Sequence, residues 1–342
     1  MSKTAGVRGV PGSLSRRASL KFLASGAALA SGGSLFLNSA RSQPLFKVRL
    51  AWAEVAACHA PIAFAVDNGL FRQRNLDVEL SYHGLDGGVI LDAIASGKVD
   101  LGAHLLLDWL KPLQQGHDVK VISGTHGGCQ RILASKSAKI DRVEDLKGKT
   151  IAVGAIGGVS HVAFIVTLAK AGLDPQADVN WRVFPFDKLG EVVNSGQADA
   201  LATLDPDAYL FKKQYELVEI ANTQSGVYKD RLCCAVAVRG DFLRTNRDVT
   251  RRVITALIDV HEYTAAHPDQ VAAFYIAKYK PAISQSDLTE VLGALVYHHH
   301  PVGPELVKET VASIDDLKLV KVLNPAVDSI NFADKITENI LA

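Results

Sequence analysis

The alternation of short apolar segments with helical segments constrains the fold of this chain most strongly. From Phe46 onward, short runs rich in Val, Ile, Leu and Ala are separated by longer stretches that end at Gly or Pro, residues that commonly stop helices. The expected strands are Val48–Trp52, Leu76–Leu80, Val99–Ala103, Val119–Gly124, Arg131–Ser135, Thr150–Gly154, Trp181–Phe184 and Ala200–Leu204. The expected helices between them are Pro61–Gly69, Gly88–Ser96, Ser160–Ala171 and Leu189–Ser195.

This alternation predicts an α/β fold, in which mostly parallel sheets carry helices on both faces. From Val249 onward the pattern is mostly helical, with breaks near Pro268, Pro281 and Pro301. The chain has 342 residues, of which 48% are apolar, so it can bury a large core. A chain of this length suits two lobes better than one.

The first 42 residues read as an export signal and not as part of the fold. Ser15–Lys21 contains the adjacent arginines of a twin-arginine signal, 22–37 is apolar, and Ala40 and Ser42 are small residues suited to cleavage. An ordinary secretory signal and a membrane anchor are the alternatives. The apolar stretch is short for a spanning helix and the arginine pair favours the twin-arginine route, so we expect a periplasmic protein.

The charge of the chain changes when this signal is removed. Residues 1–42 hold six basic residues and no acidic ones, so the formal net charge of +1 becomes −5 for the remainder. The remainder contains no basic run, which argues against nucleic acid or an anionic membrane as a partner. It also has no stretch of eighteen apolar residues, so we expect the mature protein to be soluble.

Loops at the carboxyl ends of the expected strands are the candidate ligand site. In open parallel sheets, ligands bind beyond these ends, where loops meet the first turns of helices. The loops concerned are Glu54–Ala60, His104–Asp108, Thr125–Cys129, Ala155–His161 and Asp205–Asp207.

Five segments of the sequence resemble the nitrate, sulfonate and taurine group of solute-binding proteins. They keep the order and spacing of that family, and together they cover nearly all of the chain after the signal. They are Ala60–Phe71, Asn75–Leu80, Ser96–Gly102, Asp145–Val153 and Ser195–Ala200.

The resemblance implies a two-lobed periplasmic-binding-protein fold of type II, with two parallel-rich sheets joined by two crossover hinge strands. By this resemblance, 46–131 and 234–342 form lobe 1 and 132–233 forms lobe 2. Arg131–Ser135 would be the outgoing crossover and Leu232–Val238 the return. The implied function is capture of a small anionic ligand, similar to nitrate, a sulfonate or bicarbonate, for an ABC permease and its ATPase. A monomer without catalytic residues or cofactor is expected.

The family shares its fold with thiamine-pyrimidine synthases, which carry a Cys-Cys-Cys-Phe-Cys run on the return crossover. Here only Cys233 and Cys234 are present, and the rest of the run is missing. An enzyme on this scaffold is therefore one alternative. A sensor module that docks on a receptor or kinase is another.

Several short motifs invite other functions. Gly148-Lys149-Thr150 lacks the earlier glycine of a P-loop and precedes a strand, so a phosphate-binding loop is not expected. In the Ala155–His161 loop, Ser160 is expected to cap the following helix, and Gly158 leaves backbone N–H groups free to hold an anion. His161 follows directly and is included in the candidate site.

The remaining candidates are acidic or metal-ligating side chains. Asp205 and Asp207 flank a proline and read either as solvated turn residues or as ligand contacts, and His104 and Asp108 bound another loop of the predicted cleft. The run at 298–300 consists of three histidines, and we expect it to lie on the wet surface without a specific metal role.

Two Cys/His pairs are predicted to face the same cleft. Cys58 precedes His59, and His126 precedes Cys129 by three positions. Thiolate and imidazole are ligands of copper, zinc and iron, so a metal or thiol-reactive ligand is an alternative to an anion. Buried core cysteines or a Cys58–Cys129 disulfide are the structural alternatives. Because successive strand residues point to opposite faces, only one of the adjacent cysteines is expected to face the ligand, and Cys234 is the candidate.

Overall fold

The computed structural model describes residues 44–342, so the predicted export signal at 1–42 lies outside the described residues. The described part forms two five-stranded sheets. The strands of the first sheet are β1 (Phe46–Trp52), β2 (Leu76–Tyr82), β3 (Leu101–Leu105), β4 (Val119–His126) and β10 (Cys234–Arg239). Those of the second sheet are β5 (Gln130–Ala134), β6 (Thr150–Val153), β7 (Asn180–Val183), β8 (Ala200–Leu204) and β9 (Val218–Asn222).

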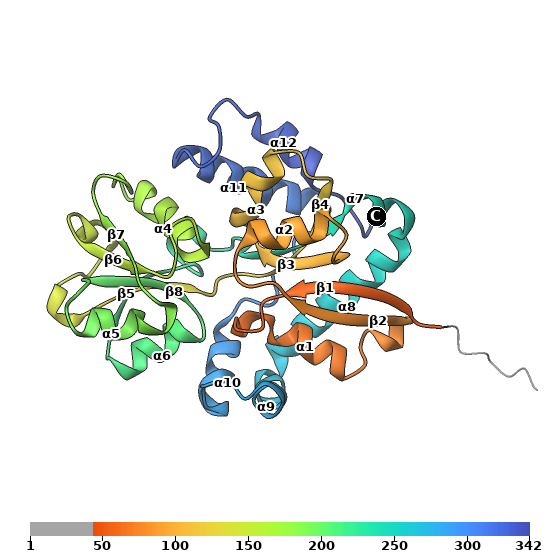
Figure 1. The fold of residues 1–342 in the computed structure, drawn as a ribbon, viewed down its shortest axis with the longest axis horizontal. Helices are drawn as coiled ribbons and strands as arrows, with labels where there is room; N and C mark the ends of the chain where they lie inside the picture. Colours follow the sequence, from red (N-terminus) through yellow and green to blue (C-terminus); the bar gives the residue numbers. More distant parts are fainter. Residues whose placement is uncertain (1–43) are drawn as a thin grey trace, which may run out of the picture. The chain divides into compact units, whose positions relative to one another are not determined.

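Helices alternate with strands along the chain as far as β10, and the part of the chain after β10 is helical (Figure 1). They are α1 (Ala60–Asp67), α2 (Gly87–Ala95), α3 (Leu106–Gln114), α4 (Val159–Lys170), α5 (Leu189–Asn194), α6 (Asp207–Gln214), α7 (Gly240–Thr245), α8 (Arg247–Ala266), α9 (Pro268–Tyr279), α10 (Gln285–Ala294), α11 (Gly303–Leu319) and α12 (Ser329–Ile336). Among the described residues, no helix combines the length and apolarity needed to cross a bilayer.

The two sheets have the same topology. The strand orders are β2-β1-β3-β10-β4 and β7-β6-β8-β5-β9, so each sheet follows the pattern second, first, third, inserted strand, fourth. In each sheet the inserted strand alone is antiparallel to its neighbours: β10 between β3 and β4, and β5 between β8 and β9. The other pairings, β1 with β2 and β3 and β6 with β7 and β8, are parallel. The predicted α/β fold with parallel-rich sheets is confirmed.

The chain passes between the sheets at two places. Residues 127–129 lead from β4 into β5, and residues 223–233 lead from β9 into β10. The strands expected at Arg131–Ser135 and Leu232–Val238 are therefore β5 and β10, each the inserted strand of the sheet that the chain has just entered.

Strand alternation in the second sheet explains how two layers of helices cover it. Ile132, Ile151 and Val153 pack with α4 residues in one apolar cluster, whereas Leu133 and Leu201 pack with α5 and α6 residues in another. Successive strand residues point to opposite faces, so each strand supplies both layers. Figure 1 shows α4 on one side of this sheet and α5 and α6 on the other.

A short sequence motif occurs once in each sheet and has the same role in both. Ser96–Leu101 and Ser195–Ala200 both read Ser-Gly-x-x-Asp followed by an apolar residue. The Asp100 carboxylate accepts a hydrogen bond from the backbone N–H of Arg49 at 2.9 Å, and the Asp199 carboxylate accepts one from Thr150 at 2.8 Å. Each aspartate thus ties the turn before the third strand to the first strand of its sheet.

The third strand begins two residues later than the sequence indicated. It spans Leu101–Leu105 instead of Val99–Ala103, because Asp100 belongs to the turn that binds Arg49. As a result His104 lies in β3 and not in a loop, and Asp108 lies in the first turn of α3. The Thr125–Cys129 loop is also shorter than expected, because β4 continues through His126.

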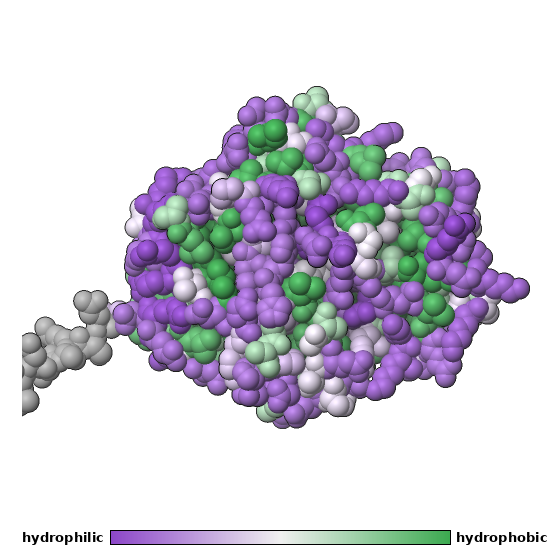
Figure 2. All heavy atoms as spheres, turned by 180° about the vertical axis from the view of Figure 1, so that it is seen from behind, coloured by the Kyte–Doolittle hydropathy of each residue, from purple (hydrophilic) through white to green (hydrophobic). Residues whose placement is uncertain are grey.

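The outer surface carries only scattered apolar side chains on the face turned away from Figure 1. On that face hydrophobic residues form separate patches among hydrophilic ones (Figure 2). Scattered apolar residues of this kind are normal for a folded domain.

Candidate functional site

A cavity of about 360 Å³ is lined by a loop and a helix that flank the first sheet and by strands, loops and a helix of the second. On the side of the second sheet it is lined by the turn after β6 and the start of α4. On the side of the first sheet it is lined by the loop before α2 and by α3. The lining residues are Leu85, Asp86, Asp108, Val153, Gly154, Ala155, Ile156, Gly157, Gly158, Val159, Ser160, His161, Phe186 and Ala202. They include the predicted site residues Asp108, Gly158, Ser160 and His161.

The start of α4 gives this cavity a positive electrostatic end. Gly158 is the N-cap residue in extended conformation (φ −75°, ψ 171°), and no side chain caps the helix. The prediction that Ser160 caps the helix is wrong, because Ser160 already lies within α4, which begins at Val159. The first N–H groups of a helix lack intrahelical acceptors and attract negative charge. The buried Ser160 hydroxyl adds a donor that has no partner within 44–342.

His161 contributes an uncharged ring to the same cavity. Its Nδ1 accepts a hydrogen bond from the Gly157 N–H at 3.2 Å, and its ring packs edge-on against Trp181 with centroids 4.7 Å apart. Burial lowers the pKa of His161 to about 4. At neutral pH it therefore supplies no positive charge to the cavity.

The opposite side of the cavity is acidic. Asp86 caps α2 by accepting from the Val89 N–H at 3.0 Å. Asp108 Oδ2 accepts from the Gly87 N–H at 2.9 Å and lies 2.9 Å from His104 Nε2, so His104 orients this carboxylate from the wall of β3. Among the lining residues there are two carboxylates and neither Lys nor Arg. The cavity thus has N–H donors at one end and carboxylate acceptors at the other.

A second, smaller cavity of about 20 Å³ lies next to the first, and its walls carry three of the four cysteines. Leu85 and Val159 line both cavities. The small cavity is lined by Ala53, Ala56, Cys58, His59, Leu85, His104, Leu105, Cys129, Gln130, Val159, Leu204 and Cys234. The structure thus brings together Cys58, His59, His104, Cys129 and Cys234, which are distant in sequence and were predicted to face one cleft.

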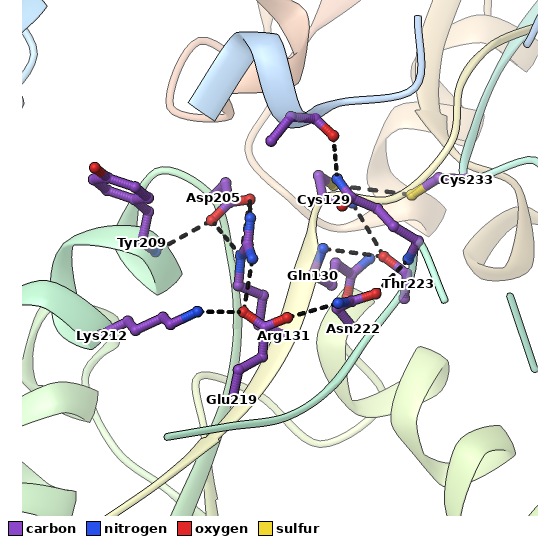
Figure 3. A network of polar contacts seen from close by, with 12 residues as sticks. Cys129, Gln130, Arg131, Asp205, Tyr209, Lys212, Glu219, Asn222, Thr223 and Cys233 are labelled. Atoms are coloured by element: carbon purple, nitrogen blue, oxygen red, sulfur yellow. Dashed lines mark hydrogen bonds and ion pairs between the residues drawn. The ribbon is translucent and has the colours of Figure 1, made fainter. Parts of the chain in front are cut away.

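All four cysteines of the chain are buried free thiols, so the structure contains no Cys58–Cys129 disulfide. Cys129 Sγ and Cys233 Sγ lie 3.8 Å apart (Figure 3). Cys58 Sγ and Cys234 Sγ lie within 4.8 Å of each other and of a ring nitrogen of His59. Hydrogen bonds from the thiols of Cys129 and Cys234 lower the pKa of Cys58 to about 6.

Of the two adjacent cysteines, only Cys234 lines the small cavity. Cys233 reaches Cys129, which lines it too. Cys233 precedes β10, which begins at Cys234, and belongs to the connecting segment. The backbone of Cys233 is held by its N–H donating to the His126 carbonyl at 3.0 Å and by its carbonyl accepting from the Leu106 N–H at 3.0 Å.

Two predicted histidines differ in how their rings are bonded. His59 Nδ1 accepts a hydrogen bond from the Ala53 N–H at 2.9 Å, and burial lowers the pKa of His59 to about 3. His126 is fully buried, and neither of its ring nitrogens has a partner within the described residues. Its ring packs edge-on against Tyr297, whose hydroxyl donates to the Cys58 carbonyl at 3.2 Å.

Asp205 does not line either cavity and is instead paired inside the protein. Its carboxylate contacts Arg131 through two nitrogens, with Nε–Oδ1 at 3.0 Å and Nη2–Oδ2 at 2.9 Å (Figure 3). Oδ1 also accepts from the Tyr209 N–H at 3.1 Å. Arg131 reaches Glu219 with its remaining Nη1 at 2.8 Å. Sequence reasoning missed this network, because its charges lie far apart along the chain.

Asp207 is half-buried in the first turn of α6 and also stays outside the two cavities. Burial and the neighbouring Asp205 and Asp187 carboxylates raise the pKa of Asp207 to about 6. The readings of Asp205 and Asp207 as exposed turn residues therefore do not hold, since the first is buried and the second is partly covered.

The histidine run at 298–300 is less exposed than expected. The side chain of His298 is 69% exposed, but that of His300 is only 8% exposed. His300 Nε2 lies 3.2 Å from Glu262, and His299 Nε2 lies 2.6 Å from Glu309. The segment turns inward here because the Pro301 carbonyl accepts a hydrogen bond from Gly124 in β4.

The family assignment comes from the sequence between residues 56 and 271. This segment matches the family model described as NMT1/THI5 like, and it covers more than half of the chain. The chain belongs to the NMT1/THI5-like family. The match contains both crossings between the sheets and every residue that lines the two cavities except Ala53. None of the curated proteins compared matches the sequence.

Solved structures confirm the fold of this NMT1/THI5-like chain. The alkanesulfonate-binding protein SsuA from Xanthomonas axonopodis pv. citri bound to MOPS is 17% identical with a TM-score of 0.71, and the match covers 86% of this chain and 98% of that one. The periplasmic nitrate-binding protein NrtA from Synechocystis PCC 6803 is 14% identical with a TM-score of 0.67, covering 86% of each chain. A ligand-binding component of an ABC-type import system from Staphylococcus aureus, with zinc bound, is 14% identical with a TM-score of 0.68, covering 86% and 97%. The chain therefore has the two-sheet periplasmic-binding-protein fold that its sequence predicted.

Proposed function

We propose that this chain is the periplasmic solute-binding component of an ABC importer and holds one small molecule in the 360 Å³ cavity. The cavity carries the proposal, because elements that flank both sheets line it and the two sheets are joined by only two connections in the described part of the chain. Structural neighbours with this fold include binding proteins for alkanesulfonates and for nitrate. The partners would be a permease and its ATPase, and the lobes would be 46–131 with 234–342 and 132–233.

The polarity of the cavity favours a ligand with two different ends. The N-terminus of α4 and the Ser160 hydroxyl would bind an anionic group such as a sulfonate. Asp86 and Asp108 would accept from an amino group or another donor at the far end. A bare anion such as nitrate is less suitable, since it would leave these carboxylates without a donor and would meet no Lys or Arg among the lining residues.

A thermal-shift panel tests the proposal with pairs of compounds that differ in one group. An aminoalkanesulfonate should raise the melting temperature more than the alkanesulfonate of equal length, nitrate or bicarbonate. At a ligand concentration one hundred times the Kd, binding adds about 2.7 kcal/mol of stability. Asp108→Asn and Ser160→Ala should each weaken the shift, whereas Asp241→Asn, a change of an exposed carboxylate that does not line the cavity, should leave it unchanged.

The proposal fails if no compound of the panel shifts the melting temperature. It also fails if compounds are converted on incubation, because the chain would then be an enzyme on this scaffold. A thiol-reactive or metallic ligand is the second candidate function, and the observation that favours it is the group of four buried free cysteines. Binding of such a ligand with no response to the sulfonates would favour this second candidate.

A further inference from the structure

The four cysteines are gathered from four separate places in the chain to one point between the sheets. Cys58 follows β1, Cys129 lies in the first connection between the sheets, and Cys233 and Cys234 lie where the second connection enters β10. They comprise every cysteine of the chain, and each is at most 5% exposed. Isolated buried cysteines commonly serve as small apolar residues. Three cysteines lining one cavity, with the fourth in contact with one of them, need a separate explanation.

The spacing of the sulfurs suits a metal better than a disulfide. Cys129 Sγ and Cys233 Sγ are 3.8 Å apart. Two thiolates on one tetrahedral zinc, each with a bond of about 2.3 Å, lie about 3.8 Å apart. A disulfide requires about 2.05 Å between the sulfurs. Cys58 and Cys234 provide a second pair of sulfurs within 4.8 Å.

The hydrogen bond of His59 argues for sulfur ligation alone. Its Nδ1 already accepts from the Ala53 N–H, so in the neutral ring the proton lies on Nε2. Neither nitrogen then offers a free lone pair to a metal. His59 instead has one N–H available, which can donate to a thiolate beside it. The nearby ring nitrogen therefore supports charge on the sulfurs without acting as a ligand.

The small cavity has an unsatisfied acceptor that points to an occupant. Gln130 is 2% exposed, lines this cavity, and its Oε1 has no donor within the described residues. A buried acceptor without a donor is costly, and such groups commonly mark an ion or water. A volume of about 20 Å³ is sufficient for one water or one metal ion and for no larger solute.

We propose that Cys58, Cys129, Cys233 and Cys234 form a binding site for one thiophilic metal ion, Zn²⁺ or Cu⁺, in the small cavity between the two sheets. The site lies beside the larger cavity and shares Leu85 and Val159 with it; it gives the second candidate function a location and does not depend on sulfonate binding in the larger cavity. Each thiol that binds the ion releases its proton to solvent, and no oxidant or reductant is required. Because Cys129 and Cys233 lie in the two connections, the ion would link both connections between the sheets.

Metal titration of the reduced chain without a His tag tests this proposal. Protein freed of metal under anaerobic conditions is titrated with Zn²⁺ alone and, in parallel, with Cu⁺ alone, in competition with a chromophoric chelator. We expect one ion per chain, release of at least two protons per ion, and sulfur as the main scatterer in X-ray absorption at the metal edge. The arm that binds more tightly against the chelator identifies the metal.

Serine variants locate the site, and histidine variants provide the controls. Cys58→Ser and Cys234→Ser should each weaken binding at least a hundredfold. His298→Ala and His299→Ala should not change metal binding. His299→Ala tests the other potential metal cluster in 44–342, which consists of His299, Glu305 and Glu309. If circular dichroism shows that a serine variant is unfolded, the X-ray absorption spectrum of the unaltered protein still decides the ligand type.

Three results would overturn the proposal. The first is a bound metal content below a tenth of an ion per chain with either metal, in which case the small cavity would hold a water molecule and no metal ion. The second is a spectrum with nitrogen and oxygen ligands alone. The third is binding that survives both serine changes and is lost in His299→Ala. None of these results affects sulfonate binding in the larger cavity, and failure of that binding would leave the metal site untouched.

Discussion

The carboxylate of Asp205 is completely buried, and Arg131 is the charge that compensates it. The two-nitrogen contact between them is the strongest geometry available to such a pair. Removing one partner of a buried ion pair is expensive, because the remaining charge is left without solvent or counter-charge. The side chain of Arg131 is itself only 12% exposed.

We therefore expect Arg131→Met to lower the free energy of unfolding by about 3–5 kcal/mol. Lys136→Met provides the matched control, because Lys136 pairs with Glu216 on the surface, where both side chains are more than half exposed. That control should change stability by less than about 1 kcal/mol. Urea denaturation measures both values. Equal losses in the two variants would show that the Arg131–Asp205 pair is not a buried charge pair in solution.

His161 predicts a dependence of stability on pH. Burial lowers its pKa to about 4 in the folded chain, whereas the ordinary value for histidine is about 6.5. Between these two pH values the unfolded state binds the proton and the folded state does not. The free energy of unfolding is therefore unaffected by His161 above about pH 6.5, and it decreases as the pH falls toward 4.

His161→Asn should remove this dependence, because the asparagine carbonyl can still accept from the Gly157 N–H without titrating in that range. Relative to the variant, the free energy of unfolding of the unaltered chain should decrease on acidification by less than about 1.4 kcal/mol per pH unit, because the ring is only partly buried. Denaturation curves at several pH values between 4 and 7 measure the difference. Parallel stability profiles for the two proteins would contradict the assignment.

The sequence predicted which residues gather at the strand ends better than it predicted which side chains pair with each other. The convergence of Cys58, His59, Cys129 and Cys234 could be predicted, because loops at the ends of parallel strands meet at one edge. The pairing of Asp205 with Arg131 could not, since no local pattern connects residues 74 positions apart. The inward position of His300 was missed for the same reason, because it depends on Glu262 and on the contact of Pro301 with β4.

At the scale of elements, α3, α6 and β9 were not identified from the sequence. The start of α3 follows β3 without an intervening loop, so the change from strand to helix at Leu106 has no Gly or Pro to mark it. β9 is an edge strand with half-buried or exposed residues, and it lacks the apolar run of an interior strand. Interior parallel strands such as β1, β6 and β8 were predicted to within two residues because burial on both faces requires continuous apolar sequence.

The repeated aspartate motif allows a comparison of one contact at two levels of burial. The side chain of Asp100 is 7% exposed and contacts Arg49 and Arg239, whereas that of Asp199 is 35% exposed and lies 3.8 Å from Lys149. Hydrogen bonds to a charged group contribute about 1.5–3 kcal/mol, and less where water competes. Asp100→Ala should therefore cost about 2–3 kcal/mol and Asp199→Ala about 1 kcal/mol, as measured by chemical denaturation. A larger loss at Asp199 would show that burial does not control the strength of this contact.

At the scale of the whole molecule, the two connections between the sheets would act as a hinge around the larger cavity. The cavity is lined from both sides, so a ligand that contacts both sides stabilises the arrangement in which they approach each other. A saturating sulfonate should therefore reduce the radius of gyration in small-angle scattering. The effect should disappear in Ile156→Trp, because Ile156 is 56% exposed and lines the cavity, so a bulkier side chain there obstructs the ligand without disturbing the core.

Val183→Trp is the matched control for this measurement. Val183 has the same 56% exposure and belongs to β7 of the second sheet, but it does not line the cavity. The Val183 variant should therefore keep both the ligand-induced thermal shift and the decrease in radius of gyration. If a ligand raises the melting temperature of the unaltered chain while the radius of gyration stays constant, the cavity binds solute without movement of the lobes. Recognition by a permease would then depend on the surface around the bound ligand and not on closure.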